Sequence, residues 1–234
     1  MSAGRARLAV AVDGPGSSGK GTVARGVARA LGYQYVDTGA MYRAVALLAR
    51  RQGVDWDDEP RLTALAEGLR FSFRWDGDQL GVEVDGEDLT HAIRADDIGR
   101  GASRVSRHPG VRGALLGRQR DLAADGGVVM DGRDIGTVVL PDADLKVFLD
   151  AALDERARRR YEELLGRGEP TTLEAVRSAL AERDRQDRER ATAPLRPAAD
   201  AVRIDSTAST IDEVVAQILH LVGARTGPGA PERR

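Results

Sequence analysis

The sequence predicts an α/β protein with a five-stranded parallel sheet flanked by helices and an inserted piece that carries antiparallel strands. Short apolar runs alternate with helical periodicity in the opening third of the chain. The middle changes to an alternation of apolar and polar residues, and mostly apolar runs return after it. With 234 residues, the chain is long enough for one large domain or for a core with an insertion.

The opening third alternates strand and helix patterns. Leu8–Val12 is a short apolar run that ends at a Gly-rich turn, and apolar residues then recur at helical spacing up to Leu31. A second short strand is predicted at Tyr33–Val36 and a helix at Ala40–Gln52. This order, strand and helix in turn, is typical of a parallel sheet.

The middle of the chain has a different pattern. Leu69–Trp75 and Leu80–Val84 alternate apolar and polar residues, and Asp76-Gly77-Asp78 lies between them. Two such runs around a Gly turn predict an antiparallel hairpin. We therefore expect residues 60–100 to be an insertion carried by the parallel core, which would consist of residues 8–59 and 101–222.

The remaining elements complete the core. Buried parallel strands are predicted where apolar runs return, at Val128–Met130 and Leu145–Leu149, and a last strand at Val202–Asp205. The predicted helices are Val111–Leu122, Leu153–Leu165, Leu173–Arg190 and Ile211–Val222. Residues 1–7 are expected to be a flexible N-terminus and 223–234 a disordered tail.

Composition excludes several classes of protein. The chain has 35 Lys and Arg against 37 Asp and Glu, so it lacks the overall positive field of a nucleic-acid binder. It contains no cysteine, which excludes disulfides and thiolate chemistry. The apolar run near the N-terminus is too short for a signal core or a membrane span. We expect a cytoplasmic monomer with no nucleic-acid or membrane partner.

A glycine-rich segment lies between the first predicted strand and the first predicted helix. It fits the pattern G-x-x-x-x-G-K, whose backbone N–H groups bind phosphate together with the positive end of the helix. Lys20 would reach the β and γ phosphates of a nucleotide, and the Thr22 hydroxyl would bind Mg²⁺. The expected nucleotide-binding residues are Gly14, Pro15, Gly16, Ser17, Ser18, Gly19, Lys20, Gly21 and Thr22.

One residue departs from the strict pattern, because Gly21 follows the lysine where Ser or Thr is usual. The alternative is a plain Gly-rich turn with a chance lysine. Composition argues against it, since the chain has only two lysines, Lys20 and Lys146, and otherwise uses arginine. A compact ammonium fits inside such a loop better than a planar guanidinium does.

Two further segments follow predicted strands. Asp37–Arg43 places a hydroxyl, an aromatic ring and an arginine at the carboxyl end of the second strand, and Asp131–Asp134 follows the strand Val128–Met130. Ligands of open α/β sheets bind at this edge. Asp131 would hold Mg²⁺ through water, while the adjacent Arg and Asp would bind a phosphate and a base. A plain turn is the alternative for Asp131–Asp134.

Arginines crowd two later helical segments, Arg156–Arg160 and Arg183–Arg190. In a mobile flap they would neutralise a transferring phosphoryl group and exclude water. The alternative is a solvated helix face with ion pairs four residues apart, for which Glu155 with Arg159 and Asp184 with Arg188 have the spacing.

A set of motifs occurs in a fixed order along the chain: D-G-P-x-x-x-G-K-G-T, D-T-G-A-M-Y-R, V-R-x-x-L-L-x-R-Q-R, D-G-R-D-I-G-T, E-R-D-x-x-D-R-x-R and A-P-L-x-P-A-A-D. Together they resemble the bacterial cytidylate kinases, and the similarity runs from about Leu8 to Val222. The predicted insertion at 60–100 also resembles the monophosphate-binding domain of those enzymes.

The resemblance implies a P-loop kinase that transfers the γ-phosphoryl group of Mg-ATP directly to CMP or dCMP. It implies a short lid at about residues 154–172 and a contact of Arg156 with ATP. The catalytic residues that it implies are Lys20, Arg133, Arg160 and Arg190. Those implied for CMP binding are Thr38, Tyr42, Arg43, Arg112, Arg133, Asp134, Arg183 and Asp187. At the position of Thr38, several members of the family have Ser, which keeps the hydroxyl.

Two other hypotheses stay open. The chain could be a nucleotide-dependent switch, which would hydrolyse ATP or GTP slowly whether or not a monophosphate is present. It could also be a P-loop kinase with another acceptor, such as UMP or a small hydroxy acid. Only the resemblance of the D-T-G-A-M-Y-R and D-G-R-D-I-G-T motifs argues against the second of these.

Overall fold

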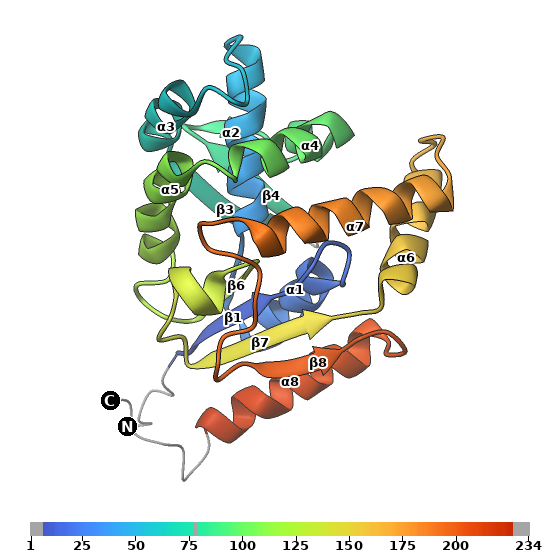
Figure 1. Cartoon of the computed structure of the whole chain (residues 1–234). Coiled ribbons are helices and arrows are strands. Elements are labelled where there is room, and N and C mark those ends of the chain that lie inside the picture. The colour runs from blue at the N-terminus through green and yellow to red at the C-terminus, as the bar shows by residue number, and fades with distance from the viewer. Residues whose placement is uncertain (1–6, 77–78, 227–234) are drawn as a thin grey trace. The chain divides into compact units, whose positions relative to one another are not determined.

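The structure, a computed structural model, describes residues 7–76 and 79–226 and divides into two compact units (Figure 1). The first unit consists of Met1–Tyr35 and Asp125–Arg234, and the second of Val36–Ala124. The second unit contains the predicted insertion at 60–100 together with the helices before and after it. The bounds of a separate monophosphate-binding domain stay a prediction.

A five-stranded sheet forms the core of the first unit, in the order β2-β6-β1-β7-β8. The pairs β1–β6, β1–β7 and β7–β8 are all parallel, which confirms the predicted architecture. All five residues of β6 are buried, as expected for a strand covered on both faces. The strands are β1 (Ala9–Asp13), β2 (Gln34–Asp37), β6 (Val128–Gly132), β7 (Leu145–Asp150) and β8 (Val202–Asp205).

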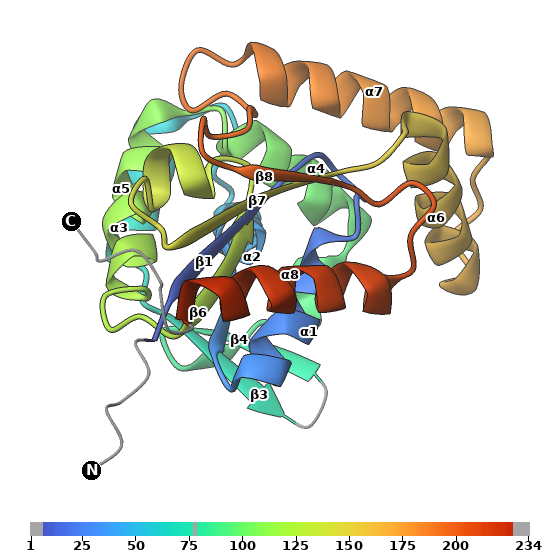
Figure 2. The same ribbon diagram turned by 90° about the horizontal axis from the view of Figure 1, so that it is seen from below.

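Four helices accompany this sheet: α1 (Lys20–Leu31), α6 (Leu153–Gly166), α7 (Leu173–Glu189) and α8 (Ile211–Thr226). Helix α1 packs against β6 and α8, and α6 packs against α7 (Figures 1 and 2). Helices α1 and α8 approach closely at Gly26, where an added Cβ would lie 2.9 Å from Val215 Cγ2. Helix α8 runs to Thr226, so the prediction of a disordered tail from residue 223 is wrong for 223–226; residues 1–6 and 227–234 lie outside the described part.

A single π-helical turn, η2 (Ile135–Val139), follows β6. The turn was not predicted, because its sequence Ile-Gly-Thr-Val-Val is rich in β-branched residues that favour strands. Leu140 N donates to Ile135 O at 2.7 Å, the bond between residues five apart that defines such a turn. The turn packs against β1 and β6, and π-helical turns are frequent at functional sites.

The second unit contains the predicted antiparallel hairpin, formed by β3 (Phe71–Asp76) and β4 (Gln79–Val84). Residues 77 and 78 of the predicted turn lie outside the described residues. A two-residue strand, β5 (Glu87–Asp88), extends the hairpin. The helices of this unit are α2 (Thr38–Arg51), α3 (Glu59–Gly68), the short 3₁₀ turn η1 (Ala92–Arg94), α4 (Asp96–Val105) and α5 (Pro109–Asp121).

Helices α3 and α4 were not predicted. The start of α3 carries a recognisable signal, since Asp58 caps the helix by accepting from Arg61 N at 3.2 Å and Pro60 stands in its first turn. Within α3 only Leu62 and Ala66 are buried, so its apolar face is too narrow to stand out as a periodic pattern. No helix in the described ranges 7–76 and 79–226 is long and apolar enough to cross a membrane.

Candidate active site

The loop between β1 and α1 is shaped by its glycines. A Cβ at Gly14 would lie 2.0 Å from Leu149 O on β7, so only glycine allows the loop to leave β1 along this path. Gly19 has a φ of 87° and is the N-cap of α1. Glycine offers no side chain to cap the helix, which leaves the first N–H groups of α1 to bind an anion.

Lys20 is the first residue of α1 and is buried, at 5% exposure. Its Nζ donates to Pro15 O in the same loop at 2.7 Å. Burial and, after it, the charge of Arg133 lower the pKa of Lys20 to about 7, although Asp131 and Asp13 act in the opposite direction. The ammonium group is therefore held inside the loop, where a bound phosphate would favour its charged form.

Asp131 lies on β6 beside this loop and is buried. The Tyr35 hydroxyl on β2 donates to Asp131 Oδ1 at 2.8 Å. A Cβ at Gly21 would lie 3.3 Å from Tyr35 Oη and 3.9 Å from Asp131 Oδ2. Glycine after the lysine, the departure from the strict pattern, thus leaves room for the pair of Tyr35 and Asp131 next to the loop.

Arginines and carboxylates alternate in a network that joins the segment after β6 to the end of α7. Arg133 Nε donates to Asp187 Oδ2 at 3.0 Å. Arg190 lies between two carboxylates, 3.5 Å from Asp134 Oδ1 and 3.7 Å from Asp187 Oδ1, and its Nε donates to Ala193 O at 2.6 Å. Burial raises the pKa of Asp187, but Arg133, Arg183 and Arg190 outweigh it and hold this pKa below its usual value.

The network adjoins the loop at Gly16. A Cβ there would lie 3.9 Å from Arg133 Nη2 and 4.0 Å from Arg183 Cδ. The first unit therefore brings the predicted residues Lys20, Asp131, Arg133 and Arg183 together. Such a site presents backbone N–H groups, an ammonium and guanidinium groups to an anion, with a carboxylate beside them.

Arg156 on α6 contacts the loop from inside the protein. Its Nη1 donates to Gly16 O at 3.1 Å, its Nε donates to Ala151 O at 2.9 Å, and its Nη2 lies 2.7 Å from Asp184 Oδ2. The side chains of Arg156 and Asp184 are only 4% and 5% exposed. The predicted contact of Arg156 with ATP stays a prediction. The four-residue spacing suggested Arg188 as the partner of Asp184. The structure pairs Asp184 with Arg156 on the neighbouring helix.

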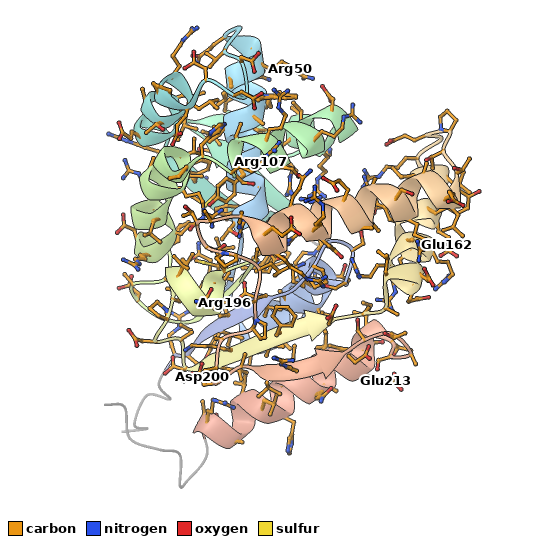
Figure 3. The ribbon with its side chains drawn as sticks, in the orientation of Figure 1. Arg50, Arg107, Glu162, Arg196, Asp200 and Glu213 are labelled. Atoms are coloured by element: carbon orange, nitrogen blue, oxygen red, sulfur yellow. The ribbon has the colours of Figure 1, made fainter. Side chains whose placement is uncertain are left out.

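Other arginines of α6 form ion pairs with carboxylates of the same helix, among them Glu162, which Figure 3 labels. Arg159 pairs with Glu155 at 2.8 Å, as the four-residue spacing predicted, and Arg158 pairs with Glu155 and with Glu162. Arg160, a predicted catalytic residue, lies 2.9 Å from Glu163 one turn away. The solvated-face alternative thus describes Arg158, which is 52% exposed. Arg159 is only 25% exposed, and its Nη2 also donates to Ser206 O at 2.6 Å.

The second unit holds the remaining predicted binding residues. Asp37 caps α2 by accepting from Ala40 N at 3.0 Å, and its other carboxylate oxygen lies 2.6 Å from Arg43 Nη2. Burial raises the pKa of Asp37, but Arg43 outweighs this and holds the pKa below its usual value. Arg112 stacks on Tyr42, 5.5 Å from the ring centroid, and Thr38 at the start of α2 is buried.

Sequence reasoning missed three buried residues beside the site: Asp13, Tyr35 and Asp184. Asp13 stood at the head of the phosphate-loop motif, which was the one signal available for it. Tyr35 looked like any apolar residue of a strand, and Asp184 like one more charge on an arginine-rich helix. Their roles depend on partners in distant segments, which spacing along the chain does not reveal.

Asp13 gives a prediction about pH and stability. Burial raises its pKa to about 6, from an ordinary 3.8, so the folded protein binds this proton more tightly than the unfolded chain does. Relative to Asp13→Asn, the wild-type protein should gain about 1 kcal/mol of unfolding free energy as the pH falls from 7 to 5. Urea unfolding of both proteins measures this, and a difference that stays constant with pH would contradict it.

The chain is similar in sequence to known proteins over nearly its whole length. The family model described as cytidylate kinase matches residues 10–224. The cytidylate kinase of Geobacillus thermodenitrificans (strain NG80-2) is 49% identical over 221 residues, which cover 94% of this chain and 99% of the relative. That of Geobacter sp. (strain M21) is 49% identical over 220 residues and covers 94% of each. A solved structure of shikimate kinase from Acinetobacter baumannii in complex with shikimate has a TM-score of 0.47 at 16% identity, over 96% of this chain and 97% of that one.

Proposed function

Because the chain belongs to the cytidylate kinase family, we propose that it transfers the γ-phosphoryl group of ATP to CMP or dCMP and releases ADP with CDP or dCDP. One structural observation carries the proposal beyond nucleotide binding. Next to the phosphate loop, Arg133 and Arg190 alternate with Asp134 and Asp187, and we propose that these arginines bind a second anion. A nucleotide switch has no need for such a set, whereas a kinase needs one for its acceptor.

On the donor side, the loop amides and Lys20 would bind the phosphates of ATP. Charge develops on the equatorial oxygens of the transferring group, and Arg133 and Arg183 beside Gly16 are close enough to the loop to neutralise it. Arg160 would add a further positive charge from the predicted lid at 154–172. The protein mainly positions and neutralises, so no side chain acts as a nucleophile.

Magnesium fits the donor set of this site. Thr22 supplies a hydroxyl in the first turn of α1, and Asp131 supplies a carboxylate beside the loop. Mg²⁺ bound to a nucleotide uses oxygen ligands and needs only one or two of them from the protein. When bound, the ion would neutralise the β and γ phosphates, and Tyr35 would hold the Asp131 carboxylate in place.

On the acceptor side, Asp134 would accept from the exocyclic amino group of cytosine, and Arg183 with Asp187 would bind near the base and sugar. Thr38, Tyr42, Arg43 and Arg112 of the second unit are the other residues that we propose for CMP binding. Arg43 and Arg112 are held by Asp37 and Tyr42, which orients them before CMP binds. We expect a cytoplasmic monomer that requires no nucleic acid or membrane.

The proposed function is tested by an ADP-release assay with Mg-ATP and each of CMP, dCMP, UMP, AMP and GMP in turn. Turnover should be strong with CMP and dCMP and weak with the purine monophosphates. An assay without acceptor measures hydrolysis alone. Slow ADP release that no monophosphate increases would favour the switch hypothesis, and strong turnover only with UMP would change the acceptor.

Asp134→Ala should mainly weaken the use of CMP. Losing a hydrogen bond to a charged acceptor costs about 1.5–3 kcal/mol, so the KM for CMP should rise by about 10- to 100-fold. The KM for ATP serves as the internal control and should change little. A variant with a normal KM for CMP would place the base elsewhere.

A further inference from the structure

The last residue of β1, Asp13, makes an unusual contact with a distant segment. Its side chain is buried, at 4% exposure. Oδ1 accepts from Ile135 N at 2.7 Å and Oδ2 accepts from Gly136 N at 2.7 Å. Both carboxylate oxygens are therefore bound to consecutive backbone N–H groups, 122 and 123 residues further along the chain.

These two N–H groups are the first of the π-helical turn η2. The first N–H groups of a helical turn have no partner inside the turn and require an acceptor from elsewhere. The residue in the N-cap position, Asp134, makes no side-chain capping bond to them. Asp13 supplies that acceptor from a neighbouring strand, and its two bonds fix both the position and the orientation of the turn.

The contact joins two parts of the active site. Asp13 immediately precedes the phosphate loop, and the turn that it holds immediately follows Arg133 and Asp134. Asp134 in turn lies 3.5 Å from Arg190, and Arg133 lies beside Gly16 of the loop. A displacement of the turn would therefore move the proposed acceptor-binding residues relative to the phosphate loop.

The carboxylate form suits this task better than an amide would. A carboxylate accepts at both oxygens, whereas the NH₂ group of asparagine would face one of the two N–H donors. Of the charged groups around Asp13, Asp134 disfavours its ionised form and Lys20 favours it. The turn is tightly packed at Gly136, because a Cβ there would lie 3.4 Å from Asp13 Oδ2 and 3.2 Å from Lys146 Cδ.

We propose that Asp13 is a positioning residue for phosphoryl transfer, whose carboxylate holds the Arg133–Asp134 segment in register with the phosphate loop. The effect on catalysis rests on the proposed function. The contact between Asp13 and the turn does not. Asp13 acts through this segment and contacts neither substrate. Supporting residues of this kind typically alter activity by about 10- to 100-fold when they are replaced.

Asp13→Asn tests the proposal, with Asp144→Asn as the matched control. Asp144 Oδ2 accepts from Ala9 N at 2.8 Å, so it makes the same kind of bond at the other end of the same strand. Two quantities are measured in each variant: hydrogen exchange of the Ile135 and Gly136 amides, and the steady-state constants for CMP and ATP. If Asp13→Asn does not fold, the same two quantities are measured in Asp13→Ser, with the same expected results.

Asp13→Asn should speed exchange at Ile135 and Gly136 and lower kcat/KM for CMP by about 10- to 100-fold, with a much smaller change in the KM for ATP. Asp144→Asn should leave both quantities near wild-type values. If Asp13→Asn showed faster amide exchange but unchanged steady-state constants, Asp13 would only cap the turn and the proposal would be wrong. Equal losses of kcat/KM in Asp13→Asn and Asp144→Asn would also overturn the proposal. If the wild-type protein transferred nothing to CMP, the proposed function would fail while the exchange result still tested the contact.

Discussion

Replacing Lys20 by alanine is expected to lower kcat for transfer to CMP by about 10³-fold while the protein stays folded. The ammonium lies inside the phosphate loop, where no other cation of the loop takes its place, and removing one preorganised charge-stabilising donor commonly costs about 10²–10³ in kcat. The fold should survive, because within the described part of the chain the side chain bonds only to Pro15 O of its own loop. Its burial also opposes the charged form, so alanine removes an unfavourable desolvation.

Lys146→Ala is the matched control, since Lys146 is the other lysine of the chain and is also buried. It pairs with Asp200, at 2.9 and 2.8 Å, on the segment before β8 (Figure 3). This variant should lose some stability, and its kcat should fall far less than that of Lys20→Ala, because Lys146 packs beside Gly136 of the turn after β6 and not inside the loop. Near-normal turnover by Lys20→Ala, with thermal unfolding unchanged, would move the phosphate site away from the loop.

Asp184→Ala is expected to lower the free energy of unfolding by about 3–5 kcal/mol, the typical cost of removing one partner from a buried ion pair. The change would leave the Arg156 guanidinium buried without its carboxylate. The same arginine donates to Gly16 O, so activity should fall along with stability. Urea unfolding and the assay with CMP measure the two effects.

The chain offers an exposed counterpart between the same two helices. Asp154 on α6 lies 2.6 Å from Arg177 on α7, and these side chains are 79% and 52% exposed. Exposed pairs contribute about 0–1 kcal/mol because water screens them, so Asp154→Ala should change little. Equal losses in the two variants would show that the helices depend on the number of ion pairs and not on the buried one.

Local patterns were enough to predict most of the parallel core. Strands β6 and β7 are buried on both faces, so apart from Lys146 their residues form apolar runs up to the closing polar residues, a pattern typical of covered parallel strands. The phosphate loop could be predicted because Gly14, Gly19 and Lys20 each meet a local requirement of conformation or charge. The hairpin of β3 and β4 showed the two-residue alternation of a half-exposed sheet.

The missed features depend on contacts between distant segments. Ile135–Val139 forms a π-helical turn although its residues favour a strand, and Asp13 from β1 supplies the acceptors for its first N–H groups. In the sequence, Asp184 resembles a surface residue of a charged helix. In the structure it is buried and pairs with Arg156 of α6. Helix α4 contains two glycines among its ten residues, and glycine lowers the intrinsic propensity for a helix.

The proposal that this chain phosphorylates CMP is tested most directly by following the phosphoryl group itself. The protein is incubated with CMP, Mg²⁺ and ATP labelled at the γ-phosphate, and the nucleotides are then separated. Label in CDP, with little in inorganic phosphate, is the expected result and would establish transfer to the monophosphate instead of to water. Label that appears only in inorganic phosphate, at a rate that CMP does not change, would contradict it.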